Sequence, residues 1–420
     1  MAKKKERIIS GIDIGSTKVS AFIGKINGSN SLEFVGAAST ECHGLRKGVV
    51  INLEAVVCAV KKVMAEAETQ AGVAMESAFV GLSGGHVRGF NNRGLIPTKG
   101  RNHEISVDDV KRVVEAARAI SLPADKEIIH ILPQCFSVDG DEGITDPLGM
   151  TGSRLEVNVH IITASITAAQ NIVTAINRCG LMVTNLVLQQ LAAAEAVLTQ
   201  DEKELGCLIV DIGGGTTDLA VFYRGTVWHS AILPVGGDNF TRDLAVGLCT
   251  PIQEAERIKR EFGSAIATSI GKGEMIEVSG VGGRPSRPVA RELIYEIVQP
   301  RAEEILEFVR EEVERTGLSK QLTAGVVLTG GGSLLSGMVE LSEQVLGMTA
   351  RRGCILDQNN VSTLSSDWLQ PMYATAVGLV RHGFNSTVQP PRSEGNGHKV
   401  VRFVPHAVAE AREWLRSMLF

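Results

Sequence analysis

Two glycine-rich stretches, about 200 residues apart, combine the residue types of a phosphate-binding site. In each, an apolar run ends in Asp-Ile-Gly, small hydroxyl residues follow, and a second apolar run begins. Glycine lets the backbone approach a ligand closely and directs successive N–H groups into one concavity, where hydroxyl side chains add donors. The pattern therefore predicts a phosphate cradle with hydroxyl donors from Ser16, Thr17, Thr216 and Thr217.

Charged residues stand next to both turns. Asp13 and Asp211 come just before the first and second turn, and Lys18 follows the first. Because Mg²⁺ keeps much of its water shell in proteins, two carboxylates can hold the ion through water molecules. Lys18 would add a positive charge at the phosphates. These residues predict a phosphate site that uses magnesium.

A third glycine turn, "LTGGGSLL", lies near residue 330. A glycine-rich hairpin without any ligand would account for one such turn on its own. Two matched copies and a third turn in the same chain make a ligand site the better interpretation.

The elements that must position these turns follow a mixed pattern. Helical stretches, with apolar residues three and four apart, alternate with short β-rich runs in both halves of the chain. Each of the first two turns joins two β-rich runs and is predicted to be a hairpin. The sequence therefore predicts an α/β fold with a duplicated plan.

Composition narrows the classes of protein. With 420 residues and 44% hydrophobic content the chain is expected to form two or more domains. A net charge of −5 argues against a general nucleic-acid binder. Seven scattered cysteines without CxxC spacing fit a reducing cytoplasm rather than a zinc site or a disulfide framework. We find no signal peptide and no apolar run approaching the ~20 residues of a transmembrane helix.

The last residues form a separate unit in the sequence. Residues 385–399 have linker composition, and residues 400–420 place apolar side chains at helical spacing with arginines on the other side. Such a helix suits an anionic membrane surface, although a helix docked on its own domain would show the same spacing. The predicted membrane-contacting residues are Val408, Ala411, Arg412, Trp414, Leu415, Arg416, Met418, Leu419 and Phe420.

The order of these motifs resembles one protein family over nearly the whole chain. "GIDIGSTKV", "GLSGGHV", "GITDPLGMTGSRLEV", "VDIGGGTTDLAV" and "LTGGGSLLSG" look like the FtsA family of bacterial cell-division proteins, within the actin-like ATPase superfamily. The resemblance implies an actin-like ATPase fold, with two duplicated domains around a nucleotide cleft and an FtsA-type subdomain 1C in place of actin subdomain 1B.

The resemblance also implies domain boundaries. Domain 1A would comprise residues 6–83, 164–200 and 358–384, interrupted by subdomain 1C at 84–163. The second domain would span 201–357, with its subdomain 2B at about 230–302, before the linker at 385–399 and the helix at 400–420.

By the same resemblance, ATP and Mg²⁺ are the expected ligands. Gln189 would position the attacking water, in a slow ATPase whose main role is structural. The nucleotide-binding residues implied are Gly15, Ser16, Thr17, Lys18, Gly213, Gly214, Gly215, Thr216, Thr217, Glu256, Lys259, Gly330, Gly331, Gly332 and Ser333.

The function implied is that of an actin-like protein that polymerises on the inner face of the bacterial cell membrane at the division septum. It would anchor FtsZ filaments there through the C-terminal helix. Partners would be the FtsZ C-terminal peptide, further copies of the chain, anionic lipids, and other division proteins bound through subdomain 1C. Arg284, Arg287 and Arg301 are the residues expected to hold the partly acidic FtsZ peptide, unless they pair with nearby glutamates instead.

Two other classes share parts of this pattern. A pilus-type ATPase adaptor of the same superfamily is the nearer alternative. A sugar kinase would share both phosphate turns but would need an acceptor cleft and has no reason for a linker and an apolar tail.

Overall fold

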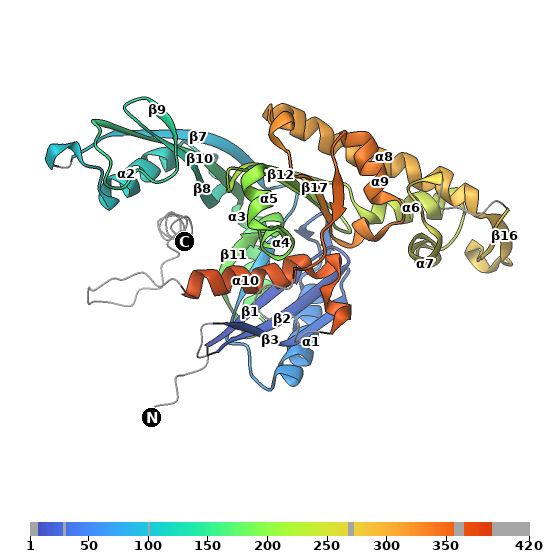
Figure 1. Ribbon diagram of the computed structural model, residues 1–420. Coiled ribbons are helices and arrows are strands. Elements are labelled where there is room, and N and C mark those ends of the chain that lie inside the picture. Colours follow the sequence, from blue (N-terminus) through green and yellow to red (C-terminus); the bar gives the residue numbers. More distant parts are fainter. Residues whose placement is uncertain (1–6, 28–30, 100, 268–272, 357–364, 389–420) are drawn as a thin grey trace.

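The computed structural model describes residues 7–27, 31–99, 101–267, 273–356 and 365–388. Two five-stranded sheets lie at its centre, and an inserted subdomain extends from one end (Figure 1). The predicted membrane helix at 400–420, and the linker from residue 389, lie outside the described residues.

The first sheet has the strand order β11-β6-β1-β2-β3. Strands β1 and β2 form the predicted hairpin, with Ile14 opposite Val19, and β6 runs parallel to β1. The helices α1 and α3 cover one face, and α4 and α10 cover the other. The bounds are β1 (Arg7–Ile14), β2 (Lys18–Ile26), β3 (Leu32–Glu41), β6 (Ser77–Leu82), β11 (Met182–Leu188), α1 (Leu53–Ala71), α3 (Ile166–Asn177), α4 (Gln189–Val197) and α10 (Ala374–Val388).

The second sheet repeats the plan, with the strand order β14-β13-β12-β17-β18. Strands β12 and β13 form the second predicted hairpin, in which Ile212 pairs with Thr217. One face carries the helices α6 to α9. The bounds are β12 (Cys207–Ile212), β13 (Thr217–Tyr223), β14 (Thr226–Leu233), β17 (Gly325–Thr329), β18 (Ala350–Arg352), α5 (Gln200–Leu205), α6 (Gly237–Gly247), α7 (Ile252–Phe262), α8 (Arg291–Thr316) and α9 (Met338–Leu346).

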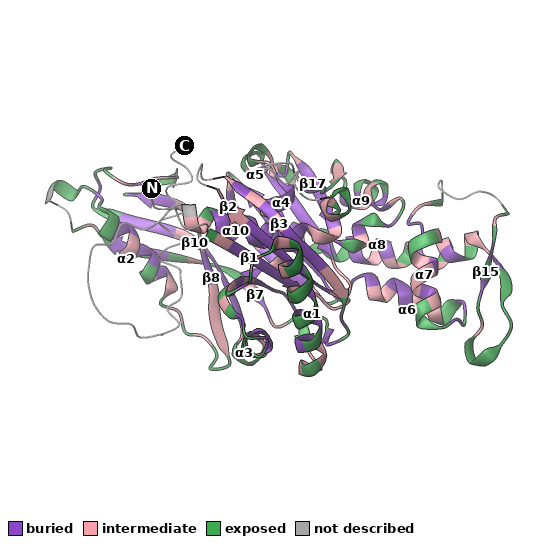
Figure 2. Ribbon diagram, turned by 90° about the horizontal axis from the view of Figure 1, so that it is seen from below, coloured by how far each residue is buried: buried purple, intermediate pink, exposed green. Residues whose placement is uncertain are grey.

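Helices α4 and α10 join the two sheets. Their buried alanines and valines share one apolar core with Phe22 of the first sheet and with Ile209 and Phe222 of the second. In Figure 2 strands β1 and β2 of the first sheet are mostly buried. Cover on both faces of the sheet explains why these two strands are largely apolar runs in the sequence.

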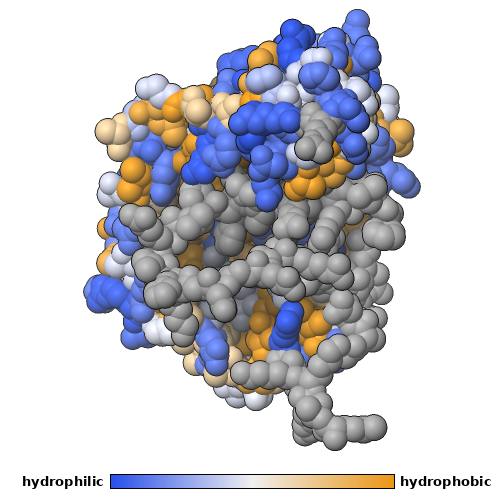
Figure 3. Space-filling view, turned by 90° about the vertical axis from the view of Figure 1, so that its left-hand side faces the viewer, coloured by the Kyte–Doolittle hydropathy of each residue, from blue (hydrophilic) through white to orange (hydrophobic). Residues whose placement is uncertain are grey.

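The inserted subdomain, residues 84–163, has its own sheet and its own core. Its strand order is β7-β10-β8-β9, and α2 packs on one face through Val110, Val113 and Ala117. A capping box between Ser106 and Asp109 begins α2. Figure 3 faces this end of the molecule, where hydrophilic side chains predominate at the top. The bounds are β7 (Arg88–Pro97), α2 (Val107–Arg118), β8 (Lys126–Val138), β9 (Asp141–Ile144) and β10 (Arg154–Ser165).

Short elements complete the second domain and the loops. The hairpin of β15 and β16 lies beside α7 and α8 at the far tip of this domain (Figure 2). The bounds are β4 (Leu45–Arg46), β5 (Val49–Val50), β15 (Met275–Val278), β16 (Arg287–Ala290), and the 3-10 turns η1 (Arg101–His103), η3 (Val281–Gly283), η4 (Ser319–Gln321), η5 (Gly331–Leu334), η7 (Ser366–Leu369) and η8 (Pro371–Tyr373).

The start predicted for the linker was wrong by four residues. Helix α10 continues to Val388, so residues 385–388 are helical. The polar side chains that suggested a linker are compatible with a helix here, because Ser386 and Thr387 donate to the carbonyl oxygens four residues earlier. Among the described residues, none of the helices has the length and apolar character needed to cross a bilayer.

Candidate functional site

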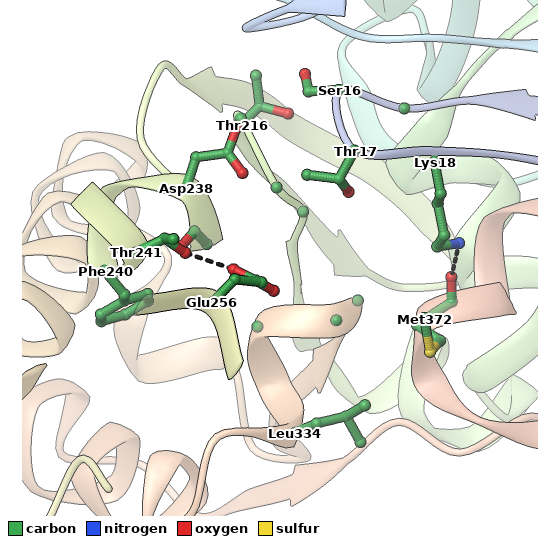
Figure 4. Close-up of a pocket in the computed structure, with 18 of the residues that line it drawn as sticks. Ser16, Thr17, Lys18, Thr216, Asp238, Phe240, Thr241, Glu256, Leu334 and Met372 are labelled. Atoms are coloured by element: carbon green, nitrogen blue, oxygen red, sulfur yellow. Dashed lines mark hydrogen bonds between the residues drawn. The ribbon is translucent and has the colours of Figure 1, made fainter. Parts of the chain in front are cut away.

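A cavity of about 1320 Å³ lies between the two domains and is lined by all three glycine turns (Figure 4). Both of the first two turns have the same local bond. Gly15 N donates to Lys18 O at 2.8 Å, and Gly213 N donates to Thr216 O at 2.9 Å. The structure thus brings together the two halves of the predicted phosphate cradle.

The two turns touch each other across the cavity, and glycine is required for this. A Cβ on Gly214 would lie 2.4 Å from Thr17 Cγ2, and one on Gly215 would lie 2.6 Å from Ser16 Oγ. Such separations are below any real Cβ contact, so a side chain at either position would have to displace Thr17 or Ser16.

Buried carboxylates line the cavity beside the turns. Burial raises the pKa of Asp13, and burial together with the Asp13 charge raises the pKa of Asp211 to about 6. Gln189 Nε2 donates to Asp13 Oδ1 at 2.8 Å, and Thr375 Oγ1 donates to Asp211 Oδ2 at 3.0 Å. Two desolvated carboxylates with few compensating cations favour a bound cation.

This donor set fits magnesium held through water. The structure groups no three metal-ligating side chains tightly enough to hold a metal directly, as far as the described residues extend. Asp13 and Asp211 both line the cavity, next to the turns that would hold phosphate oxygens. Mg²⁺ needs only one or two carboxylates in addition to phosphates and water.

Asp218 is a cavity residue that the sequence analysis missed. Ser83 Oγ donates to Asp218 Oδ1 at 2.8 Å, and both side chains are buried. Burial, with the nearby charge of Asp211, raises the pKa of Asp218 well above its usual range. The hairpin register could have revealed this residue, because Asp218 pairs directly with Asp211.

Strand alternation separates Thr217 from its neighbours. Thr216 and Asp218 line the cavity, whereas the buried Thr217 hydroxyl donates to Val235 O at 2.9 Å. The predicted contribution of the Thr217 hydroxyl to the cradle is therefore wrong.

Lys18 lines the cavity, but its ammonium group is directed elsewhere. Lys18 Nζ donates to Met372 O and lies 4.6 Å from the centre of the Tyr373 ring. In Figure 4 this group points away from Ser16 and Thr17. Burial lowers the pKa of Lys18, against the opposing charges of Asp13 and Asp211.

At the other end of the cavity, Glu256 and Lys259 occupy one face of α7, as predicted from their spacing. Their carboxylate and ammonium groups are 2.6 Å apart. Lys259 also donates to Gly237 O and Thr241 Oγ1, and Thr241 donates to Glu256. Burial opposes ionisation of Glu256, but the Lys259 charge holds its pKa below the usual range.

The third turn packs beneath the second hairpin. Gly330 has a φ of 79°, and a Cβ there would lie 2.2 Å from Asp211 Oδ1. Ser333, predicted to meet a nucleoside, is fully buried, and its hydroxyl donates to Gly330 O at 2.7 Å. Leu334 lines the cavity in its place (Figure 4).

Other cavity residues carry no sequence signal that we recognised. Asp238 lies in the first turn of α6, and its N–H donates to Gly214 O at 2.7 Å. Burial raises the pKa of Asp238. The remaining residues missed by the sequence analysis include His43, Ser83, Thr241, Met372, Tyr373 and Thr375.

The three arginines predicted to bind an acidic peptide lie outside this cavity, after η3, on β16 and within α8. Arg284 is exposed, and Arg287 donates to Leu248 O at 2.9 Å. Arg301 is ten residues into α8, about 15 Å from the helix start. It pairs with Asp243 and Glu304.

Pairing with a nearby glutamate, the alternative to peptide binding, holds for Arg301 and Glu304, whereas two other nearby glutamates have other contacts. Glu292 accepts from Gly273 N, and Glu303 accepts from Gln299. Arg287 and Arg301 both reach helix α6, at its C-cap Leu248 and at Asp243, so their role in peptide binding stays a prediction.

Comparison with known proteins identifies two matching families. The model described as cell division protein FtsA matches residues 208–378, and the model described as SHS2 domain inserted in FTSA matches residues 84–163. The chain is 43% identical over 377 residues to cell division protein FtsA of Pseudomonas aeruginosa, covering 90% of this chain and 89% of the relative. It is 36% identical over 426 residues to that of Escherichia coli K12, covering 99% and 100%.

Solved structures share the fold. A chain of the PilM-PilN type IV pilus biogenesis complex superposes with a TM-score of 0.65 at 20% identity, over 90% of this chain and 98% of that chain. MreB5 of Spiroplasma citri bound to ADP superposes with a TM-score of 0.54 at 15% identity, over 91% and 97%. The actin-like fold predicted from the sequence is confirmed.

Proposed function

Because the chain belongs to the FtsA family of cell division proteins, we propose that it binds ATP with Mg²⁺ in the cleft and anchors FtsZ filaments to the membrane. One observation carries the nucleotide part of this proposal. The two matched glycine turns come from different domains and meet in one cavity, next to three buried carboxylates. A phosphate chain between the turns would contact both domains at once.

The residues around the cavity suggest how a nucleotide would be held. Backbone N–H groups of both turns, with Ser16, Thr17 and Thr216, would bind the phosphates, while Glu256 and Lys259 would bind the ribose and base. Mg²⁺ held by Asp13 and Asp211 would neutralise phosphate charge. Gln189 can orient a water molecule but is a poor base, so we expect slow turnover.

The membrane part of the proposal comes from the family and from residues 400–420. An amphipathic helix on one chain buries only one face and must order itself first, so a single helix binds weakly. If the chain polymerises, linked helices raise one another's effective concentration, and binding tightens without new contacts. The chain would then lie on the cytoplasmic side of the membrane at the septum.

A groove beside Arg301 is the site we propose for the FtsZ C-terminal peptide. The groove has a volume of about 430 Å³ and is lined by Pro234 and Phe308. Its charged residues are Arg301 and Arg315, together with the glutamates that pair with them, Glu304, Glu311 and Glu312. Arginine binds carboxylates with two parallel hydrogen bonds, which suits a partly acidic peptide. Other division proteins would bind the inserted subdomain.

The nucleotide site is tested by equilibrium ATP binding to the double variant Gly214→Asp, Thr216→Lys. Its acidic group and added bulk should abolish measurable binding, while the control Thr69→Lys, on the exposed face of α1, should bind as the wild type does. Unchanged affinity in the double variant would remove the cavity as the ATP site.

Anchoring is tested by sedimentation with anionic vesicles, with FtsZ present, using the full chain and a chain without residues 400–420. FtsZ should pellet only with the full chain. The pilus-type alternative rests on a likeness of fold at 20% identity. It would gain support if the chain captured pilus components and not FtsZ.

A further inference from the structure

The inserted subdomain contacts the second domain as well as the first domain that contains it. Strand β14 of the second domain packs against β7, β8 and β10. Side chains of Asn91, Gln134 and His160 meet the segment Val227–Ser230 there. We call Asn91, Gln134, His160 and the segment Val227–Ser230 together the latch.

The hydrogen bonds of the latch require a proton on Nδ1 of His160. Gln134 Nε2 donates to Val227 O at 3.1 Å and to Trp228 O at 3.2 Å, and Asn91 Nδ2 donates to Trp228 O at 3.3 Å. Asn91 Oδ1 is therefore an acceptor, and His160 Nδ1, 2.6 Å away, must donate to it. In the neutral ring, His160 Nε2 accepts from the Ser230 hydroxyl at 2.8 Å.

The latch is buried and closely packed. His160 is fully buried and Ser230 is 4% exposed. A Cβ on Gly89 would lie 2.6 Å from both His160 Nε2 and Ser230 Oγ. A small shift of the inserted subdomain would leave buried polar groups of the latch without hydrogen-bond partners. Such a network favours two discrete states, closed or fully open.

Strand β14 connects the latch to the phosphate cradle. Ser230 pairs with Ala220 of β13, and β13 begins at Thr217, in the second glycine turn. Ser83, the last residue before the inserted subdomain, donates to Asp218 on the same strand at 2.8 Å. The inserted subdomain is thus connected to the second glycine turn in two places. One is Ser83, where the chain enters the subdomain, and the other is the latch on strand β14.

We propose that the latch couples the position of the inserted subdomain to the occupancy of the cleft, so that a protein bound to this subdomain changes nucleotide affinity and the reverse. The coupling rests on the proposed nucleotide site. Because linkage is reciprocal, the factor by which bound nucleotide favours the closed latch equals the factor by which the closed latch raises nucleotide affinity.

The test is hydrogen exchange of the full-length protein with and without saturating ATP and Mg²⁺. In the wild type, ATP should slow exchange of the β7 and β10 amides by about fivefold or more. In Ser230→Ala, which removes the donor to His160, slowing in β7 and β10 should fall below about twofold, while slowing in β17, at the cleft, persists. Ser153→Ala, an exposed serine of the same subdomain outside the latch, should behave as the wild type.

Gln134→Met removes a different latch donor and should give the same loss, so the proposal does not depend on the folding of one variant. Equal slowing of β7 and β10 in the wild type and both latch variants would overturn it. So would wild-type protein that binds ATP without any slowing in the inserted subdomain. Failure of the wild type to bind ATP would instead overturn the proposed nucleotide site, and the coupling with it.

Discussion

Acidification should open the latch, because His160 is held there as a neutral side chain. Burial, together with the charge of His229, lowers the pKa of His160 from 6.5 to about 3. The His229 ring centre is 6.3 Å away, and Glu312 and Arg315 lie beyond it. When the latch opens, water reaches His160 and its pKa returns toward 6.5.

The sign and the size follow from proton linkage. Between pH 3 and 6.5 the open form binds more protons than the closed form, so the stability of the closed latch rises with pH over this window. The stability that neutral His160 contributes to the closed latch is fully present above about pH 7 and is lost as the pH falls. At pH 5 the closed latch should therefore be less stable than at high pH by about 2 kcal/mol, which is roughly thirtyfold in the opening equilibrium.

Native-state amide exchange of β7 and β10, corrected for the intrinsic effect of pH, measures this opening free energy. His160→Gln keeps an amide at the position and cannot titrate, so it should lose most of the pH dependence between pH 7.5 and pH 5. A remainder is expected from His86, whose pKa burial lowers to about 4. His103→Asn is the control, since His103 is exposed and asparagine tolerates its positive φ.

The reasoning would be refuted by His160→Gln protein that shows the same change in opening free energy as the wild type over this range. It would also be refuted if His103→Asn removed as much of the pH dependence as His160→Gln does.

Four further outcomes are expected. Gly214→Ala puts a methyl group 2.4 Å from a side chain of the first turn, and overpacking of this size costs about 1–3 kcal/mol, so calorimetric titration should show ATP affinity lowered about fivefold or more. Gln189→Ala should slow ATP turnover about tenfold or more in a phosphate-release assay; turnover at the wild-type rate would exclude this side chain from water positioning. Removal of residues 400–420 should abolish pelleting with anionic vesicles and leave ATP affinity unchanged, whereas continued pelleting would place membrane contact elsewhere. Charge reversal at Arg301 and Arg315, the two arginines of the proposed groove, should weaken binding of the FtsZ peptide and make what remains less sensitive to salt; equal affinity at low salt would move the peptide site away from this groove.

The sequence alone predicted the parts of the site that form within a few neighbouring residues. A turn such as Gly213–Thr217 is a local structure, because its glycines, hydroxyls and flanking β-rich runs lie together in the chain and fix the hairpin. The same holds for Glu256 and Lys259, whose spacing places them on one face of a helix. The duplicated plan was likewise visible, since each half repeats the hairpin pattern.

Contacts between distant elements were decided by the tertiary structure. Whether Lys18 points to the phosphates or to Met372 depends on how α10 packs against the first sheet, and nothing near Lys18 in the sequence states this. The bond from Ser83 to Asp218 and the latch at His160 join residues 70 to 135 positions apart. Their partners are chosen by the packing of one domain on another, which no short stretch of sequence encodes, because the fit depends on side chains from all the strands and helices involved.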